Sequence, residues 1–194
     1  IVNLINFFYP MTDTRPLNVF KYCPKCGSGK FLPSGERSLK CADCGFHYFV
    51  NSAAAVAALI TNAEGKLMLV TRSVEPNYGK LDLPGGFVDP LESAEEAVCR
   101  ELKEELGLKV KSLEYLFSAP NEYLFAGLTV FTLDLAFKVT VDSPLEKLEA
   151  KDDIQAYRFY SEEEFDYKDI PAPSINYFVQ RYFRSNTDSL ITAQ

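Results

Sequence analysis

The sequence is poor in histidine, in basic charge and in long apolar runs, and each shortage argues against a class of function. Its 194 residues contain a single histidine, His47, so any hydrolytic chemistry has to rest on carboxylates and metal. No apolar run approaches the roughly 20 residues that a membrane-spanning helix needs. The net charge of −7 disfavours a broad attraction to nucleic acid or anionic lipid, and we expect no membrane partner.

The amino-terminal residues and the cysteine count bear on location. Residues 1–10 are apolar but lack the basic leader and the small-residue cleavage site of a signal peptide, and Met11 is a candidate alternative start. Five cysteines, an odd number, fit a reducing compartment better than a disulfide scaffold. The sequence therefore predicts a cytoplasmic protein.

Four cysteines form two C-x2-C pairs separated by fourteen residues, at Cys23, Cys26, Cys41 and Cys44. Each pair is followed by a glycine, which lets the backbone turn beneath a metal so that its amides face the sulfurs. Four thiolates suit tetrahedral zinc with no open position, so the predicted role is structural, and such a short segment would depend on the metal for its folding energy. A redox C-x-x-C is the weaker alternative, because it needs only one pair and a βαβ context.

The predicted zinc ribbon is locally basic, since residues 21–50 hold five basic and two acidic side chains, a charge of +3. A solvated surface is the preferred interpretation and a docking role comes second. His47 follows the last cysteine, and with four thiolates already present it is predicted to be a strand residue and not a ligand.

The rest of the chain alternates between strand and helix patterns. Apolar segments predict strands at 53–60, 67–72, 108–119, 128–139 and 154–160. Helices are expected at 94–106 and 174–183, with a short capped turn at 161–165. This order fits an α+β fold, in which a mixed sheet packs between helices as an α/β/α sandwich beside the small ribbon. The expected regions are a leader (1–20), the zinc ribbon (21–48), the main domain (50–184) and a tail (185–194).

The helix predicted at 94–106 is unusually acidic. Ser93 and Glu96 have the form of a capping box and Gly107 is a natural helix stop. At 100° per residue the packing stripe comprises Val98, Leu102 and Leu106, with Cys99 at its margin as a small packing residue.

Three glutamates of this helix, Glu101, Glu104 and Glu105, share an arc in which the preceding turns present only Ala94 and Ala97. They are therefore predicted to stand beside open space. A solvated acidic face is one interpretation. However, like charges at i and i+4 are unfavourable, by a few tenths of a kcal/mol, and a hard cation such as Mg²⁺ reverses that sign.

The segment 86–108 consists of Gly86, five further residues, Glu92, seven further residues and then RELKEELGL. This spacing resembles the Nudix box at every defined position. The resemblance extends over about residues 50–184 and implies a Nudix hydrolase domain with an α/β/α sandwich and this loop–helix–loop as its catalytic element. It also implies hydrolysis of a nucleoside diphosphate linked to another moiety, with Mg²⁺ or Mn²⁺ as cofactor.

The resemblance further implies roles for single residues. The metal ligands would be Glu101, Glu104, Glu105 and the backbone carbonyl of Gly86. Arg100 would hold the carboxylates in place, and Glu92 would buttress the loop. One box glutamate, or an acid outside the box, would accept a proton from the attacking water. Asp153 is the outside candidate, with an ordinary strand-start acid as its alternative.

The ribbon joined to this domain looks like the NADH pyrophosphatase branch of the family. That branch carries a Ser-Gln-Pro-Trp signature after the box. Here Ser118 and Pro120 match, whereas Ala119 and Asn121 stand for the Gln and the Trp, and the chain has no tryptophan. NADH and ADP-ribose are the leading substrates. The candidate substrate contacts are Arg72, Tyr78, Asn121 and Tyr123, each with packing or surface exposure as its default role.

Other functions stay open at this point. The same box serves a sanitising hydrolase of nucleoside triphosphates. A nucleotide-sensing regulator that binds nucleic acid through the ribbon would tolerate a decayed box and favour a basic surface, and this chain has the reverse of both. The expected partner is a nucleotide-type small molecule, with NAD-capped RNA positioned by the ribbon as an intermediate possibility. Dimers are common in the family, which points to a homodimer.

Overall fold

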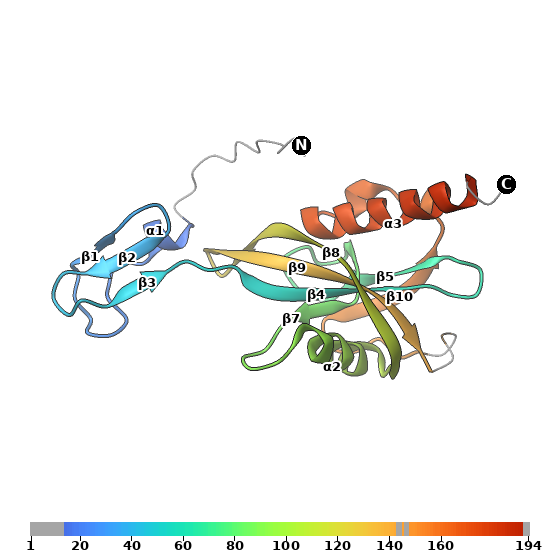
Figure 1. The fold of residues 1–194 in the computed structure, drawn as a ribbon, viewed down its shortest axis with the longest axis horizontal. Helices are drawn as coiled ribbons and strands as arrows, with labels where there is room; N and C mark the ends of the chain where they lie inside the picture. Colours follow the sequence, from blue (N-terminus) through green and yellow to red (C-terminus); the bar gives the residue numbers. More distant parts are fainter. Residues whose placement is uncertain (1–13, 143–144, 146–147, 192–194) are drawn as a thin grey trace. The chain divides into compact units, whose positions relative to one another are not determined.

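The computed structural model describes residues 14–142, 145 and 148–191, with side chains through residue 185. Met11, most of the expected leader and the last residues of the expected tail lie outside the described residues. The chain divides into two compact units (Figure 1). Among the described residues, the smaller unit holds 14–52 and Glu122–Val130, and the larger one holds Ala53–Asn121 and those from Phe131 onward.

The smaller unit is built around the cysteines. Its antiparallel sheet has the order β1-β2-β3, and its core consists of Cys23, Phe31, Leu39 and Cys41. The backbone N–H of Thr129 donates to the carbonyl of Thr14 at 2.7 Å. Its elements are α1 (Pro16–Val19), β1 (Phe31–Pro33), β2 (Ser38–Cys41) and β3 (His47–Phe49). His47 lies in a strand, as predicted.

The larger unit contains two sheets. The four-stranded sheet has the order β7-β4-β9-β8, with β4 parallel to β9 and antiparallel to β7, and the three-stranded sheet has the order β10-β5-β6. This mixed sheet confirms the predicted fold class. The strands are β4 (Ala53–Ile60), β5 (Leu67–Arg72), β6 (Leu81–Asp82), β7 (Gly85–Phe87), β8 (Val110–Phe125), β9 (Leu128–Val141) and β10 (Ile154–Tyr160). The end of β8 and the start of β9, within residues 122–130, belong to the smaller unit.

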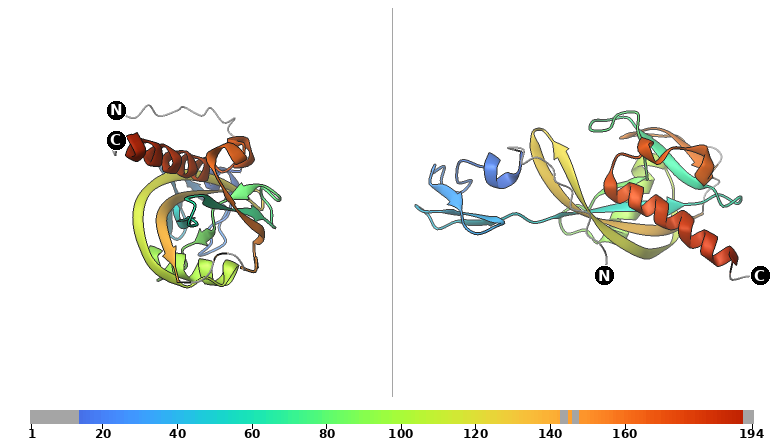
Figure 2. Two further views of the ribbon diagram at one scale, coloured as in Figure 1. Left: turned by 90° about the vertical axis from the view of Figure 1, so that its right-hand side faces the viewer. Right: turned by 90° about the horizontal axis from the view of Figure 1, so that it is seen from above.

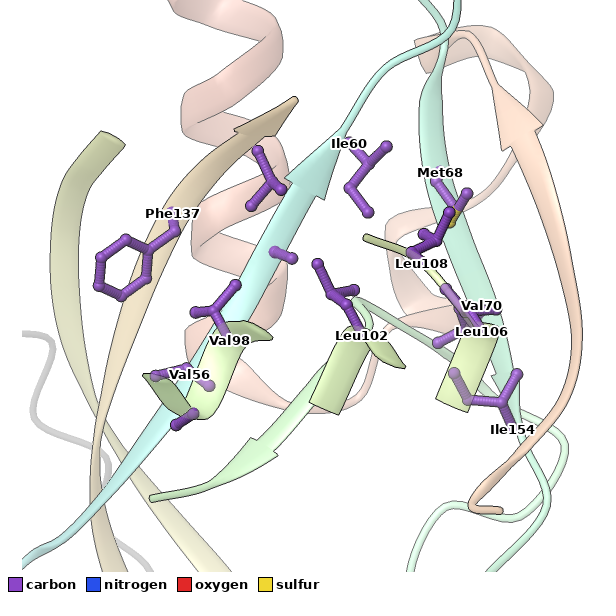
Figure 3. Close-up of a cluster of buried hydrophobic side chains, with 13 residues drawn as sticks. Val56, Ile60, Met68, Val70, Val98, Leu102, Leu106, Leu108, Phe137 and Ile154 are labelled. Atoms are coloured by element: carbon purple, nitrogen blue, oxygen red, sulfur yellow. The ribbon is translucent and has the colours of Figure 1, made fainter. Parts of the chain in front are cut away.

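Helices α2 (Ala94–Leu106) and α3 (Pro173–Ile191) cover opposite faces of the four-stranded sheet (Figures 1 and 2). Alternate residues of β4 supply both cores, because successive side chains of a strand point to opposite faces. Val56 and Ile60 pack with the apolar stripe of α2, as Figure 3 shows, and Ala58 belongs to the same cluster. Ala57 and Leu59 belong to the second cluster, which includes the buried face of α3.

The observed elements agree with the predicted ones where the local signal is strong. Helix α2 has the predicted bounds, and β4, β5 and β10 match their apolar segments. The predicted short turn is a 3-10 helix (Glu162–Glu164), followed by a second one (Tyr167–Asp169). Strand β8 runs further than predicted, and α3 continues into the segment expected to lack a pattern. Among the described residues, no helix is long and apolar enough to cross a membrane.

Candidate active site and metal centre

The four thiols of the smaller unit lie within 4.8 Å of one another. The sulfurs of Cys23 and Cys44 are 3.6 Å apart and those of Cys26 and Cys41 are 3.7 Å apart. A Zn–S distance of about 2.3 Å places the corners of a tetrahedron about 3.8 Å apart, whereas a disulfide requires about 2.05 Å. Backbone N–H groups of Cys44 and Asp43 lower the pKa of Cys41 to about 6. The cluster is therefore compatible with zinc.

The second candidate centre is the acidic helix α2, whose ends are fixed by local hydrogen bonds. The Ser93 side chain accepts from the N–H of Glu96, and the Glu96 carboxylate accepts from the N–H of Ser93, which is the predicted capping box. Gly107 ends the helix at φ +66°. Because both ends are fixed, the register of every carboxylate on this helix is fixed as well.

Arg100 is the centre of the hydrogen-bond network on α2. Its Nε and Nη2 donate to the two carboxylate oxygens of Glu92, at 2.8 and 2.9 Å, in a bidentate pair. Nη1 donates to Glu101 at 2.8 Å and to Glu104 at 3.2 Å. Nη2 also donates to the carbonyl of Phe87 at 2.9 Å. Hydrogen bonds from Arg100 hold the pKa of Glu92 below its usual range. Arg100 thus ties α2 to the loop before it.

Glu105 is a nearly buried carboxyl group with 4% of its surface exposed. The N–H of Gly85 donates to its Oε2 at 3.0 Å. Burial raises its pKa to about 9, against the opposing effect of that N–H; the charges of Glu101, Asp82 and Asp153 raise it further. Burial also raises the pKa of Glu101, with Arg100 opposing. Such a set of crowded oxygens is favourable for a cation and unfavourable without one.

The glycines before α2 allow the loop to approach these carboxylates closely. A Cβ on Gly86 would lie 2.5 Å from Oε1 of Glu101, and a Cβ on Gly85 would overlap the carbonyl of Val56 on the neighbouring strand. Gly85 also has φ +141°, a conformation that other residues rarely adopt. The backbone of β7 therefore lies directly against the carboxylates of α2.

One expectation about α2 is wrong in part. Ala97 was predicted to leave open space beside the glutamates, but it is buried in the core between α2 and the sheet, and Glu105 is buried with it. Of the three glutamates, Glu104 faces solvent, with 50% of its side chain exposed, against 14% for Glu101. Cys99 is exposed and not the packing residue that we predicted.

Asp153 lies in the turn before β10, at the position that the sequence indicated. The N–H of Lys151 donates to the carbonyl of Glu105 at 2.8 Å, so this turn is attached to the end of α2. That contact explains why the charge of Asp153 acts on Glu105, and why the charge of Asp152 acts on Glu101. Nothing in the residue pattern indicates this contact, because a backbone group makes it.

The four predicted substrate contacts have different surroundings. Arg72 donates to the Pro76 carbonyl and to Asp82, both at 3.0 Å, and so braces the loop before the box. Tyr78 is exposed. Tyr123 lies in the smaller unit with its ring stacked on Phe125 at 6.3 Å. Their roles toward a substrate stay predictions.

Asn121, the fourth candidate, leads to a polar cluster that the sequence analysis missed. Its Nδ2 donates to Oδ2 of Asp134 at 3.3 Å, and the hydroxyl of Ser174 at the start of α3 donates to the same oxygen. Asp134 is 5% exposed. The available signal was an acidic residue in the middle of the apolar alternation LTVFTLDLAF.

The raised pKa of Glu105 predicts a pH dependence of stability. Glu105 has a pKa of about 9 in the folded state and about 4.5 in the unfolded state, so between these two pH values only the folded state keeps the proton. The free energy of unfolding should therefore fall as pH rises from about 5 to 9, by up to about 1.4 kcal/mol per pH unit. Denaturant titrations of zinc-loaded protein without Mg²⁺ measure this slope. Glu105→Gln should reduce the slope of the unfolding free energy against pH. An unchanged slope would contradict the assignment of this pH dependence to Glu105.

Comparisons with known proteins agree with this geometry. The NUDIX domain family model matches residues 51–181. The chain is 32% identical over 133 residues to the NAD-capped RNA hydrolase NudC of Deinococcus radiodurans, covering 68% of this chain and 48% of that protein. It is 32% identical over 130 residues to the NAD-capped RNA hydrolase NudC of Shigella dysenteriae serotype 1, covering 67% of this chain and 50% of that protein. The chain thus spans about half the length of these curated relatives.

A solved structure shares the fold of this chain. The NUDIX hydrolase from Nitrosomonas europaea superposes with a TM-score of 0.63 at 22% identity, over 87% of this chain and 93% of that one. At this level of identity the likeness concerns the fold alone.

Proposed function

Because this chain belongs to the NUDIX family, we propose that it is a metal-dependent pyrophosphohydrolase that cleaves a nucleoside diphosphate linked to another moiety. The single observation that carries the proposal is the arrangement on α2. Glu101 and the nearly buried Glu105 lie against the Gly85–Gly86 backbone, and Arg100 donates hydrogen bonds to Glu101 and to the exposed Glu104. This arrangement is costly as structure alone, because buried like charges raise each other's pKa. It becomes favourable when a divalent cation is bound.

The residues present fit a hard cation. Oxygen ligands suit Mg²⁺ or Mn²⁺, and we assign the ligands as Glu101, Glu104, Glu105 and the carbonyl of Gly86. A bound divalent cation supplies Lewis acidity, which activates water and offsets charge on the phosphoryl oxygens. Glu105 must lose its proton to act as a ligand, so metal binding should strengthen as pH rises.

The remaining groups of the site hold the carboxylates in place or accept protons. Arg100 fixes the rotamers of Glu101 and Glu104 and, through Glu92, the loop that leads into α2. Exposed Glu104 and the nearby Asp153 are the candidate acceptors of the proton from the attacking water. The histidine of this chain lies on the ribbon strand β3, so a carboxylate has to take this role within the larger unit.

The substrate is proposed to be of NAD(H) or ADP-ribose type. The two relatives described above are among the curated proteins that match, and both are named as NAD-capped RNA hydrolases. Their names favour NAD-linked substrates, and NAD-capped RNA is the larger candidate. The test is hydrolysis of NADH, NAD, ADP-ribose, NAD-capped RNA, diadenosine polyphosphates and dNTPs, with Mg²⁺ or Mn²⁺. We expect the nucleoside diphosphate derivatives to be preferred. A preference for dNTPs would instead support a sanitising hydrolase, and no hydrolysis at all would favour a nucleotide-sensing regulator.

The four thiols are proposed to hold one structural zinc ion. Cys41→Ser should lower the zinc content well below the one equivalent expected for the unaltered chain, because a hydroxyl is a poor zinc ligand and three thiolates leave an open position. Zinc release measured with a chromogenic chelator checks this. Cys99→Ser is the matched control, since Cys99 is an exposed thiol outside the cluster. Equal zinc in both variants would contradict the assignment. A homodimer and a cytoplasmic location stay predictions.

A further inference from the structure

The face of the four-stranded sheet under α3 carries three buried polar side-chain atoms that lack a hydrogen-bond partner. They are Oδ1 of Asn121, Oγ1 of Thr132 and Oδ1 of Asp134, and none has a partner among the residues that the structure describes. Thr132 and Asp134 are 4% and 5% exposed. A buried polar group left without a partner costs about 1–3 kcal/mol. We call these three residues the Asp134 cluster.

Strand register connects the Asp134 cluster to the box. Asp134 on β9 pairs with Ala55 on β4, and Ala55 pairs with Phe87 on β7, so the three side chains share one face of the sheet. With neighbouring strands about 4.8 Å apart, Asp134 lies about 10 Å from Phe87 along this row. The carbonyl of Phe87 accepts from Arg100 of the acidic helix. The row therefore begins at the proposed catalytic loop and ends at the Asp134 cluster.

The side chains along this row are small until it reaches the cluster. Ala55 contributes a methyl group, and the next row pairs Ala57 with Gly85. Ala55 is half-buried and Phe87 is 43% exposed, so this part of the row is accessible to the planar ring of a base, with Asp134 at its buried end. An anion does not suit the far end, because a carboxyl and an amide oxygen are acceptors. An amino group suits it, since it offers two N–H donors.

We propose that the Asp134 cluster binds the amino group of a substrate's base or pyridine ring, with the ring lying over Ala55. This inference rests on the proposed function and deepens it. Adenine and a nicotinamide carboxamide both present such a group. Hypoxanthine and nicotinate present an oxygen at that position, which would face the acceptor oxygens of Asn121 and Asp134 unpaired. We expect discrimination of about tenfold or more against the oxygen-bearing analogue, from the cost of unpaired buried acceptors.

The test compares kcat/KM for two substrate pairs. One pair is ADP-ribose and its hypoxanthine counterpart, and the other is NADH and its nicotinate counterpart. Preference for the amino member of either pair supports the inference and identifies the ring that is bound. Asp134→Asn should reduce or reverse this preference, because an asparagine amide donates to an oxygen. Asp142→Asn, the same change on the exposed residue after β9, should retain it.

The outcomes separate a binding role from a structural one. If Asp134→Asn lowers kcat/KM by the same factor for both members of a pair, or if the unaltered chain shows no preference in either pair, the inference is wrong. Thr132→Val, which replaces a hydroxyl with a methyl of similar shape, should also reduce the preference and serves if Asp134→Asn fails to fold. If the chain hydrolyses neither pair, calorimetric binding of ADP and IDP decides. A tenfold preference for ADP would keep the inference while the proposed function fails, and equal binding would overturn both.

Discussion

Glu105→Gln should lower kcat/KM by a factor of about 10³ or more while the folded structure persists. Losing one preorganised electrostatic group of an active site typically costs about 10²–10³ in rate, and Glu105 is also assigned as a metal ligand. Glutamine can still accept the hydrogen bond that Gly85 donates to Oε2. With the pKa of Glu105 at about 9, the metal-free carboxyl is already neutral at pH 7, so glutamine resembles it in charge as well as in shape.

The comparison that decides this prediction uses the same change elsewhere on α2. Glu95→Gln alters an exposed glutamate in the first turn of the helix, remote from the carboxylate arc. It should leave kcat/KM within about twofold, because surface substitutions have small effects. Steady-state hydrolysis and thermal melting of both variants check this. If Glu105→Gln retains activity comparable to that of Glu95→Gln, the assigned role of Glu105 is refuted.

Arg100→Ala should lower kcat/KM by about 10²-fold and also lower the melting temperature. Four hydrogen bonds to carboxylates and one to the Phe87 carbonyl are lost together. Glu92 and Glu101, each with 14% of its side chain exposed, would be left without their cationic partner. A displacement of about 1 Å in a catalytic group can itself cost about 10²-fold in rate.

Arg100→Lys separates charge from geometry in the same network. Lysine keeps the positive charge but cannot form a bidentate pair with Glu92 or reach several acceptors at once. We therefore expect its melting temperature to recover more than its activity. Equal recovery of both quantities would mean that Arg100 acts through charge alone, contrary to the positioning role proposed here.

The features that the sequence predicted best are those fixed by neighbouring residues. The bounds of α2 follow from the capping box of Ser93 and Glu96 and from Gly107, all of which act within one turn of the helix. The thiol cluster follows from the spacing of two C-x2-C pairs. The strand β4 follows from an uninterrupted apolar run. In each case the physical cause lies within a few residues of the element that it determines.

The features that the sequence did not predict depend on contacts between distant segments. Glu105 is buried because β7 and the turn at Lys151 close over it, and helical periodicity alone places it beside solvent. Strand β7 gives no strand signal, since two of its three residues are glycines. The Asp134 cluster needs β8, β9 and the start of α3 together, and β9 alone shows only an acid in an apolar strand.

Binding of Mn²⁺ followed by electron paramagnetic resonance tests the central claim most directly. Zinc-loaded protein at pH 8 is titrated with Mn²⁺ in the presence of a non-hydrolysable ADP analogue, in parallel with the double variant Glu104→Gln, Glu105→Gln. The carboxylates of α2 should bind at least one Mn²⁺ per chain, and the double variant should lose this binding by a factor of about ten or more. Equal Mn²⁺ binding by the two proteins would contradict the account.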